Sequence, residues 1–381
     1  MLDSLQLDRA FLAEKDVQIL EIETQISKLQ AQISALEGSI SVLRTAKQPA
    51  QTRLDSYKYP VLTLPPEIVA EIFLHFLPTY PDPPPLTGIR SPIWLSHICC
   101  QWRRIALSTC VLWRAINLTG IARDGQLREK GAALLALSWL ERSGCAPLSI
   151  CAVDHAETNL IISIFLGYQA RWEHLSLTAI HSTQLREMAL TPMPLLRTLH
   201  LDFTQAVTAP LMFSNQHLPL LRVVVLNDCL RPSVGLPWFQ LTSLTLRFIF
   251  MEECISILQR TRHLVDCTLQ FQTRTAFQQY PDVTDTVLPS LQKLVFERHS
   301  DPAMGPFLSF ISPALRHLEV IEGLLGLSGT IPPVDPIRTL ETFISKSGCK
   351  LQELRITEAY IYSPDGYRDA FPSIPIITAD K

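Results

Sequence analysis

"LRTLHL", from Leu196 to Leu201, has leucine at its first, fourth and sixth positions, and related hexapeptides recur along about half of the chain. The second half of six of the eight hexapeptides alternates apolar and polar residues, as a half-buried strand does, whereas "LRVVVL" and "LQKLVF" end in three apolar residues. Apolar residues replace leucine at some positions. The seven other copies are "WEHLSL" at Trp172, "LRVVVL" at Leu221, "LTSLTL" at Leu241, "LVDCTL" at Leu264, "LQKLVF" at Leu291, "LRHLEV" at Leu315 and "LQELRI" at Leu351.

The regular spacing of these copies indicates a repeat. Successive copies start 20 to 27 residues apart, except the last, which starts 36 residues after its predecessor. Leucine-rich repeats have this period, with inward leucines on a short strand and a helix or turn that returns the chain. "PLSICAV" at Pro147 is interpreted as an earlier degenerate copy. We expect an irregular leucine-rich-repeat solenoid over residues 119–381, with an ordinary α/β domain of unrelated strands as the alternative.

Side chains between the inward leucines should point to the open face of the strands. They form a mixed-charge set, which suits a protein ligand, although any solvated strand face is polar. The set is therefore a stronger prediction than any single member. The predicted target-binding residues are His200, Asp202, Arg247, Lys293, Glu297, Glu319 and Arg355.

Residues 1–48 carry a heptad pattern. Isoleucines recur seven residues apart, and a second apolar series, mostly leucine, interleaves with them three residues later. This assignment favours a two-stranded parallel coiled coil and hence a homodimer. An amphipathic helix packed on its own chain is the alternative, and Pro49 predicts that the helix ends near Lys47. The predicted seam consists of Ile19, Ile22, Ile26, Leu29, Ile33, Leu36, Ile40 and Leu43.

Residues 60–118 predict a small all-α module. "LTLPPEIVAEIF" (Leu62–Phe73) and "LSHICCQWRRIALSTCVLW" (Leu95–Trp113) each have apolar residues at helical spacing, and prolines between Pro78 and Pro85 indicate an extended loop. Ser91 followed by Pro92 predicts the start of another helix. A module of so few residues can bury only a little surface by itself. The excess of apolar side chains therefore points to a partner.

These two stretches resemble the F-box, the helical module by which substrate receptors join a Skp-family adaptor and a cullin in ubiquitin ligases. The loop is longer than in many F-boxes, and Cys110 stands where that family usually carries proline. With the heptads and the repeats, the chain is similar to F-box proteins of the type expanded in mushroom-forming fungi. Some of the matching side chains must form the core of the module itself. The resemblance implies adaptor contacts from Leu64, Pro65, Ile68, Ile72, Phe73, Leu95, Ile98, Trp102 and Ile105.

Composition argues against several functions. The formal net charge is −3, with 33 basic and 36 acidic residues and no long basic block, so we expect no nucleic-acid partner. Nine scattered cysteines without a secretory leader predict a reducing setting, cytoplasmic and/or nuclear. No apolar run is long enough to predict a membrane span. Cys254, His263 and Cys267 match no zinc spacing, and we expect no metal, cofactor or catalytic residue.

The sequence thus predicts a multidomain α/β protein with three parts: a coiled-coil helix, an F-box and a solenoid. By the resemblance, it is a non-catalytic substrate receptor of a Skp–cullin–F-box ubiquitin ligase, with an unknown target held by the repeats. The alternative is a scaffold or interaction protein that delivers nothing for degradation.

Overall fold

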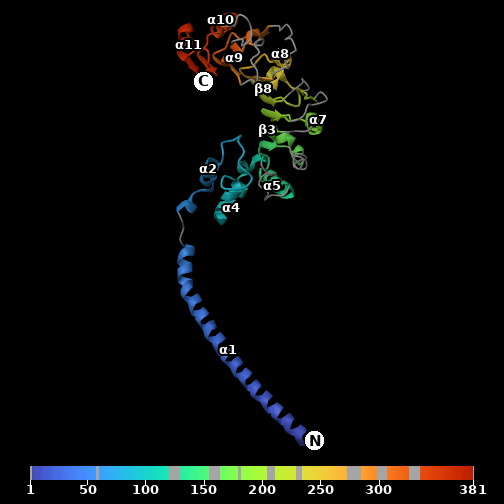
Figure 1. The fold of residues 1–381 in the computed structure, drawn as a ribbon, viewed down its shortest axis with the longest axis vertical. Coiled ribbons are helices and arrows are strands. Elements are labelled where there is room, and N and C mark those ends of the chain that lie inside the picture. The colour runs from blue at the N-terminus through green and yellow to red at the C-terminus, as the bar shows by residue number, and fades with distance from the viewer. Residues whose placement is uncertain are drawn as a thin grey trace. The chain divides into compact units, whose positions relative to one another are not determined.

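The computed structural model describes residues 2–56, 60–119, 129–153, 164–178, 182–203, 211–228, 234–272, 285–297, 307–325 and 335–380 (Figure 1). The chain divides into two compact units, Met1–Pro65 and Pro66–Lys381. The protein is mixed α/β, with a long N-terminal helix and a C-terminal parallel sheet, as the sequence predicts.

The first unit consists of α1 (Leu2–Ser56) and a short 3₁₀ turn at Pro60–Thr63. The prediction that the helix ends near Lys47 was wrong, because α1 continues through Pro49 for another two turns. Proline removes the amide that would bond the Thr45 carbonyl. That carbonyl lies on an exposed helix, where water can replace the missing donor. A side-chain hydrogen bond stabilises the next turn, because Gln51 Nε2 donates to Asp55 Oδ1 at 2.9 Å.

The second unit begins with a helical hairpin. Its helices are α2 (Pro66–Phe76), α3 (Pro92–Leu95) and α4 (Cys100–Ser108), followed by a 3₁₀ turn at Cys110–Trp113. Ser91 caps α3 as predicted, because its Oγ accepts from the Ile93 amide at 3.2 Å. The rings of Phe73 and Trp102 meet edge to face, 5.0 Å apart, and join α2 to α4.

A tryptophan pair joins this hairpin to the rest of the unit. Trp113 is fully buried, and its ring meets that of Trp139 on α5 (Glu129–Arg142) at 5.4 Å and nearly a right angle. The Trp113 indole donates to the Ala106 carbonyl at 2.8 Å, which fixes the turn after α4. The prediction that residues 60–118 are wholly α-helical was wrong at its end, because residues 115–117 form the first strand of the sheet.

Within the residues that the structure describes, the main sheet has eleven strands, and every pair of neighbours is parallel. Each strand pairs with the next long strand along the chain. All eight hexapeptides and "PLSICAV" form strands, as expected. In order, the strands are β1 (Ala115–Asn117), β2 (Leu148–Val153), β3 (Trp172–Thr178), β4 (Thr198–Asp202), β6 (Val223–Asn227), β8 (Ser243–Ile249), β9 (Asp266–Phe271), β11 (Lys293–Phe296), β13 (His317–Ile321), β14 (Glu353–Thr357) and β15 (Ile376–Ala379).

The inward leucines form the core. Leu175, Leu199 and Leu244 occupy the same register position on their strands and are at most 2% exposed. Helices α5, α7 (Ser182–Leu190), α8 (Met251–Leu258) and α10 (Pro336–Ser347) lie along one side of the row of strands (Figure 1). Two short parallel pairs accompany them, β5 (Leu211–Met212) with β7 (Val234–Gly235) and β10 (Thr286–Val287) with β12 (Phe310–Ile311). The other face of the eleven-stranded sheet, here named the open face, carries the alternating polar residues.

A left-handed residue follows the same register position in three of the strands. Asp228, Phe248 and Glu358 have φ angles of 55°, 53° and 52°. Asp228 and Glu358 directly follow the ends of β6 and β14, whereas Phe248 lies within β8, where the register shifts before Ile249. Such angles are uncommon for residues other than glycine. The three residues therefore occupy equivalent positions along their strands.

A buried carboxylate secures the C-terminal part of the sheet. Glu322, at the start of α9 (Glu322–Leu325), is 1% exposed. One of its oxygens accepts from the amides of Tyr360 and Ile361, and the other accepts from the Tyr362 amide and the Tyr367 hydroxyl. The loop after β14 is therefore tied to α9 and α11 (Pro364–Ala370) through one side chain.

We expect Glu322→Ala to lower the free energy of local unfolding by about 2 to 4 kcal/mol, because three amides and a hydroxyl lose their shared acceptor. Hydrogen exchange at Tyr360, Ile361 and Tyr362 measures this loss, as faster exchange at all three. Tyr367→Phe removes one bond only and should cost about 1 kcal/mol. Unchanged exchange in Glu322→Ala would contradict the assigned role.

Candidate functional site

Helix α2 exposes a row of large apolar side chains, here named the α2 ridge. It consists of Ile68, Ile72 and Phe76, which are 50%, 44% and 39% exposed and follow one another at i, i+4 and i+8. The neighbouring side of the helix holds the fully buried Val69 and Phe73. The helix is thus apolar on two sides and has packed only one of them.

The predicted adaptor residues differ in how much of their side chains is exposed. Phe73, Leu95 and Ile105 are buried within the hairpin, so they belong to its core and present no side-chain surface to a partner. Ile98 is 52% exposed, whereas Trp102 is half-buried against Phe73. Ile68 and Ile72 lie in the α2 ridge. Leu64 is half-buried and Pro65 is exposed, both at the end of the first unit.

The predicted seam of α1 is exposed along its whole length. The exposed fractions of its eight side chains run from 47% at Ile26 to 69% at Leu43. Within its own unit, the helix therefore carries an apolar stripe that nothing covers. The structure does not place this unit relative to the second one, so the predicted pairing stays a prediction.

The structure brings all seven predicted target-binding residues to the open face. His200 and Asp202 lie on β4, Arg247 on β8, Lys293 on β11 and Glu297 directly after it. Glu319 and Arg355 lie opposite each other on β13 and β14. All alternate with buried core residues of the same strands.

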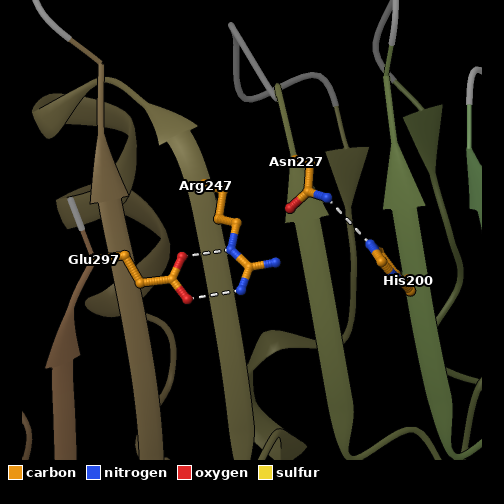
Figure 2. Close-up of polar contacts among 4 residues, drawn as sticks. All are labelled: His200, Asn227, Arg247 and Glu297. Atoms are coloured by element: carbon orange, nitrogen blue, oxygen red, sulfur yellow. Dashed lines mark hydrogen bonds and ion pairs between the residues drawn. The ribbon is translucent and has the colours of Figure 1, made fainter. Parts of the chain in front are cut away.

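Two side-chain contacts order the middle of this face, one between Arg247 and Glu297 and one between Asn227 and His200. Figure 2 shows the four side chains on the same face of the sheet. Arg247 reaches across β9 to Glu297, with Nε–Oε2 at 2.5 Å and Nη2–Oε1 at 2.7 Å. This bidentate contact raises the pKa of the Arg247 guanidinium above its ordinary value. Asn227 Nδ2 and His200 Nε2 are 3.2 Å apart, and His200 Nδ1 lies 3.2 Å from Ser176 Oγ.

A groove of about 510 Å³ opens over β9, β11, β13 and β14, here named the C-terminal groove. Arg355 Nη2 lies 3.1 Å from Asp380 Oδ2, and its Nε lies 4.0 Å from Glu319 Oε1. The groove is lined by Asp266, Gln292, Lys293, Val295, His317, Leu318, Glu319, Glu353 and Arg355.

The proline-rich loop occupies the other end of the open face, and residues 78–86 are here named the strap. Tyr80 donates its hydroxyl to Glu173 Oε2 at 2.8 Å, and the Arg114 guanidinium lies 3.7 Å from its ring centre. Ser149 Oγ donates to the Pro81 carbonyl at 2.6 Å. Burial and the bond to Glu173 raise the pKa of Tyr80 above its usual range. The strap thus lies against β2 and β3 and connects them to the hairpin.

Two histidines of the open face are partly desolvated. Burial lowers the pKa of His174 and of His200 below the ordinary value of 6.5. His174 Nδ1 lies 3.1 Å from Thr198 Oγ1, and the His174 ring meets that of Tyr80 edge to face at 5.3 Å. Both histidines are therefore neutral at pH 7, and the open face has less positive charge than its residue types suggest.

These lowered pKa values predict a loss of stability in acid. The folded protein binds these protons less readily than the unfolded chain, so stability is complete above pH 6.5 and falls as the pH drops through the lower folded-state values. The thermal midpoint should decrease less between pH 7 and pH 5 in His200→Asn than in the wild type. The exposed His97 provides the matched control, because His97→Asn should leave the slope unchanged. Equal slopes in all three proteins would exclude His200 as a contributor.

No group of three or more histidine, cysteine or acidic side chains gathers as a metal site among the described residues. Cys254 and Cys267 are buried, and burial raises the pKa of both thiols, whereas His263 is exposed. None of the helices that the structure describes is long and apolar enough to cross a bilayer.

Sequence reasoning missed Asp266 and the contacts of Tyr80. Asp266 precedes Cys267 in "LVDCTL" and has the same place in its strand as Lys293, so the alternation that found the other residues could have found it. Tyr80 and Glu173 are 93 residues apart and belong to no shared pattern. No family model matches the chain, and no curated protein matches it either.

Proposed function

We propose that the protein is a substrate receptor of a Skp–cullin–F-box ubiquitin ligase. The observation that carries this proposal is the α2 ridge, an exposed apolar row on the helical stretch that resembles an F-box. A helix that leaves such a row uncovered is suited to bind a hydrophobic surface of a partner. Ile98 adds a further exposed apolar side chain beside α4.

The proposal takes the sheet as an irregular leucine-rich-repeat solenoid. Eleven parallel strands in chain order, inward leucines at matching register, and left-handed residues at equivalent positions support it. The open face then binds the target protein. The receptor itself supplies no catalytic residue, because holding the target near the charged ubiquitin carrier raises the effective concentration of its lysines.

In this proposal the seam of α1 forms a parallel homodimer that carries two receptors. Isoleucine at the first seam position and leucine at most of the second favour two parallel strands. A cytoplasmic or nuclear location follows from the requirement for the adaptor and the cullin. The buried free thiols Cys254, Cys267 and Cys349 are compatible with a reducing compartment.

The test is co-expression of the full chain with a Skp-family adaptor, followed by size-exclusion chromatography with light scattering. We expect one complex that contains both proteins. A receptor that elutes alone, soluble and folded, would overturn the proposal. In a reconstituted reaction, the complex with a cullin should support ubiquitin transfer that depends on the receptor.

A scaffold that delivers nothing for degradation is the second candidate. The exposed seam of α1 favours it, because this stripe offers an interaction that needs no adaptor. Dependence on the adaptor separates the two functions. A scaffold keeps its partners when the α2 ridge is altered, whereas a ligase receptor loses ubiquitin transfer.

A further inference from the structure

We infer that the C-terminal groove binds an extended, unphosphorylated protein segment that carries lysine or arginine. This inference rests on the proposed function in one respect, since it names the class of target that the open face receives.

The charge of the groove favours a basic ligand. Its lining has three carboxylates, those of Asp266, Glu319 and Glu353, and two permanent cations, Lys293 and Arg355. Asp380 lies beside Arg355, which makes four carboxylates against two permanent cations and a formal charge of −2 for these six groups. A lysine or arginine side chain gains attraction here, and a dianionic phosphate meets net repulsion.

The cations of the groove are also poorly placed for a phosphate. Arg355 is held by Asp380 and Glu319. Lys293 is the one lining cation without a carboxylate partner among the described residues, and Asp266 lies next to it in the sheet register. Phosphate recognition normally uses several converging cations. The carboxylates retain free acceptor sites, because each can accept more hydrogen bonds than it receives here.

The strap shows how this face holds a peptide. Residues 78–86 contact the first strands without regular structure of their own, with the Pro81 carbonyl accepting from Ser149 on β2 and the Tyr80 ring meeting that of His174 on β3. The C-terminal groove continues the same face over four neighbouring strands. Strands lie about 4.8 Å apart, so the groove spans roughly 14 Å, the length of about four extended residues.

The probe is a short fluorescein-labelled peptide in which lysine alternates with serine, titrated into the full-length protein at low salt and followed by anisotropy. The same peptide with phosphoserine is the second probe. We expect the unphosphorylated peptide to bind more tightly. Glu319→Gln with Glu353→Gln should weaken its binding about three- to tenfold, because the variant loses two of the carboxylates that attract the basic side chains.

Two further variants make the result specific. Lys293→Gln should strengthen binding of the unphosphorylated peptide, because it removes a repelling charge from the groove. Glu341→Gln with Asp369→Asn removes two exposed carboxylates from α10 and α11 and should leave the affinity within about twofold of the wild type. Tighter binding of the phosphorylated peptide, or an unchanged affinity in the Glu319 and Glu353 variant, would overturn the inference.

This outcome is separable from the proposed function. The groove variants are on the open face, so they should still co-elute with the adaptor. If the wild type binds the peptide as expected and never binds the adaptor, the ligase proposal fails and the groove assignment stands. If the adaptor binds and the peptide results contradict the expectation, the groove assignment fails and the ligase proposal stands.

Discussion

Ile68→Asp combined with Ile72→Asp should abolish co-elution with the adaptor while the protein remains folded. Both side chains are about half exposed, so their replacement removes little of the hairpin core. In an interface, the central apolar residues carry most of the binding energy, about 2 to 4 kcal/mol each. A buried carboxylate adds a desolvation cost. We expect binding at least about a hundredfold weaker, measured by light scattering of the mixed proteins.

The matched control for this variant is Leu134→Asp. Leu134 is 66% exposed on α5, outside the hairpin, so its replacement introduces the same chemistry elsewhere in the second unit. It should leave adaptor binding intact. Trp102 is a poor choice for this test, because its ring packs on the buried Phe73 and a charge there would disrupt the hairpin itself. Full adaptor binding by the double variant would exclude the α2 ridge as the docking surface.

Ile26→Lys combined with Ile33→Lys should convert a dimer of the full chain into a monomer. Both residues belong to the seam and are exposed within their own unit. In a parallel pair, each substitution places two ammonium groups in an apolar layer that had buried two isoleucines. The lost burial alone amounts to roughly 3 kcal/mol or more for each layer. The mass from light scattering should halve at micromolar concentration.

Leu20→Lys with Val42→Lys is the control for the seam. These residues are 66% and 69% exposed on α1 but lie outside the heptad series. The control should remain dimeric, with the same helical circular dichroism as the wild type. A wild type that is already monomeric, or seam variants that keep the dimer mass, would show that α1 does not pair through these residues.

The strands could be predicted because their pattern is local. Leucines two residues apart fix which side of a strand is buried, and this placed His200, Arg247 and Glu319 on the correct face. The first and last strands were missed. Ala115–Asn117 has only three residues, and Ile376–Ala379 lacks the preceding leucine of the hexapeptide.

The hairpin and α1 show where the sequence was insufficient. Helical spacing places Ile68, Phe73 and Ile105 on apolar faces of their helices, but it does not show which face of a small bundle packs inward. In the structure Phe73 and Ile105 are buried, whereas Ile68 is exposed. Pro49 predicts that α1 ends near Lys47, yet the helix continues to Ser56, because an exposed helix can hydrate the one carbonyl that proline leaves unpaired.

The strap also determines which substitutions the sheet tolerates. Ser149 is 4% exposed beneath it, so a change there removes a bond to Pro81 and alters the junction between sheet and hairpin. Lys293 is exposed at the other end of the sheet, and substitutions at exposed positions usually change stability by less than about 0.5 kcal/mol. We therefore expect sequence changes to cost more stability under the strap than at the exposed positions of the far strands.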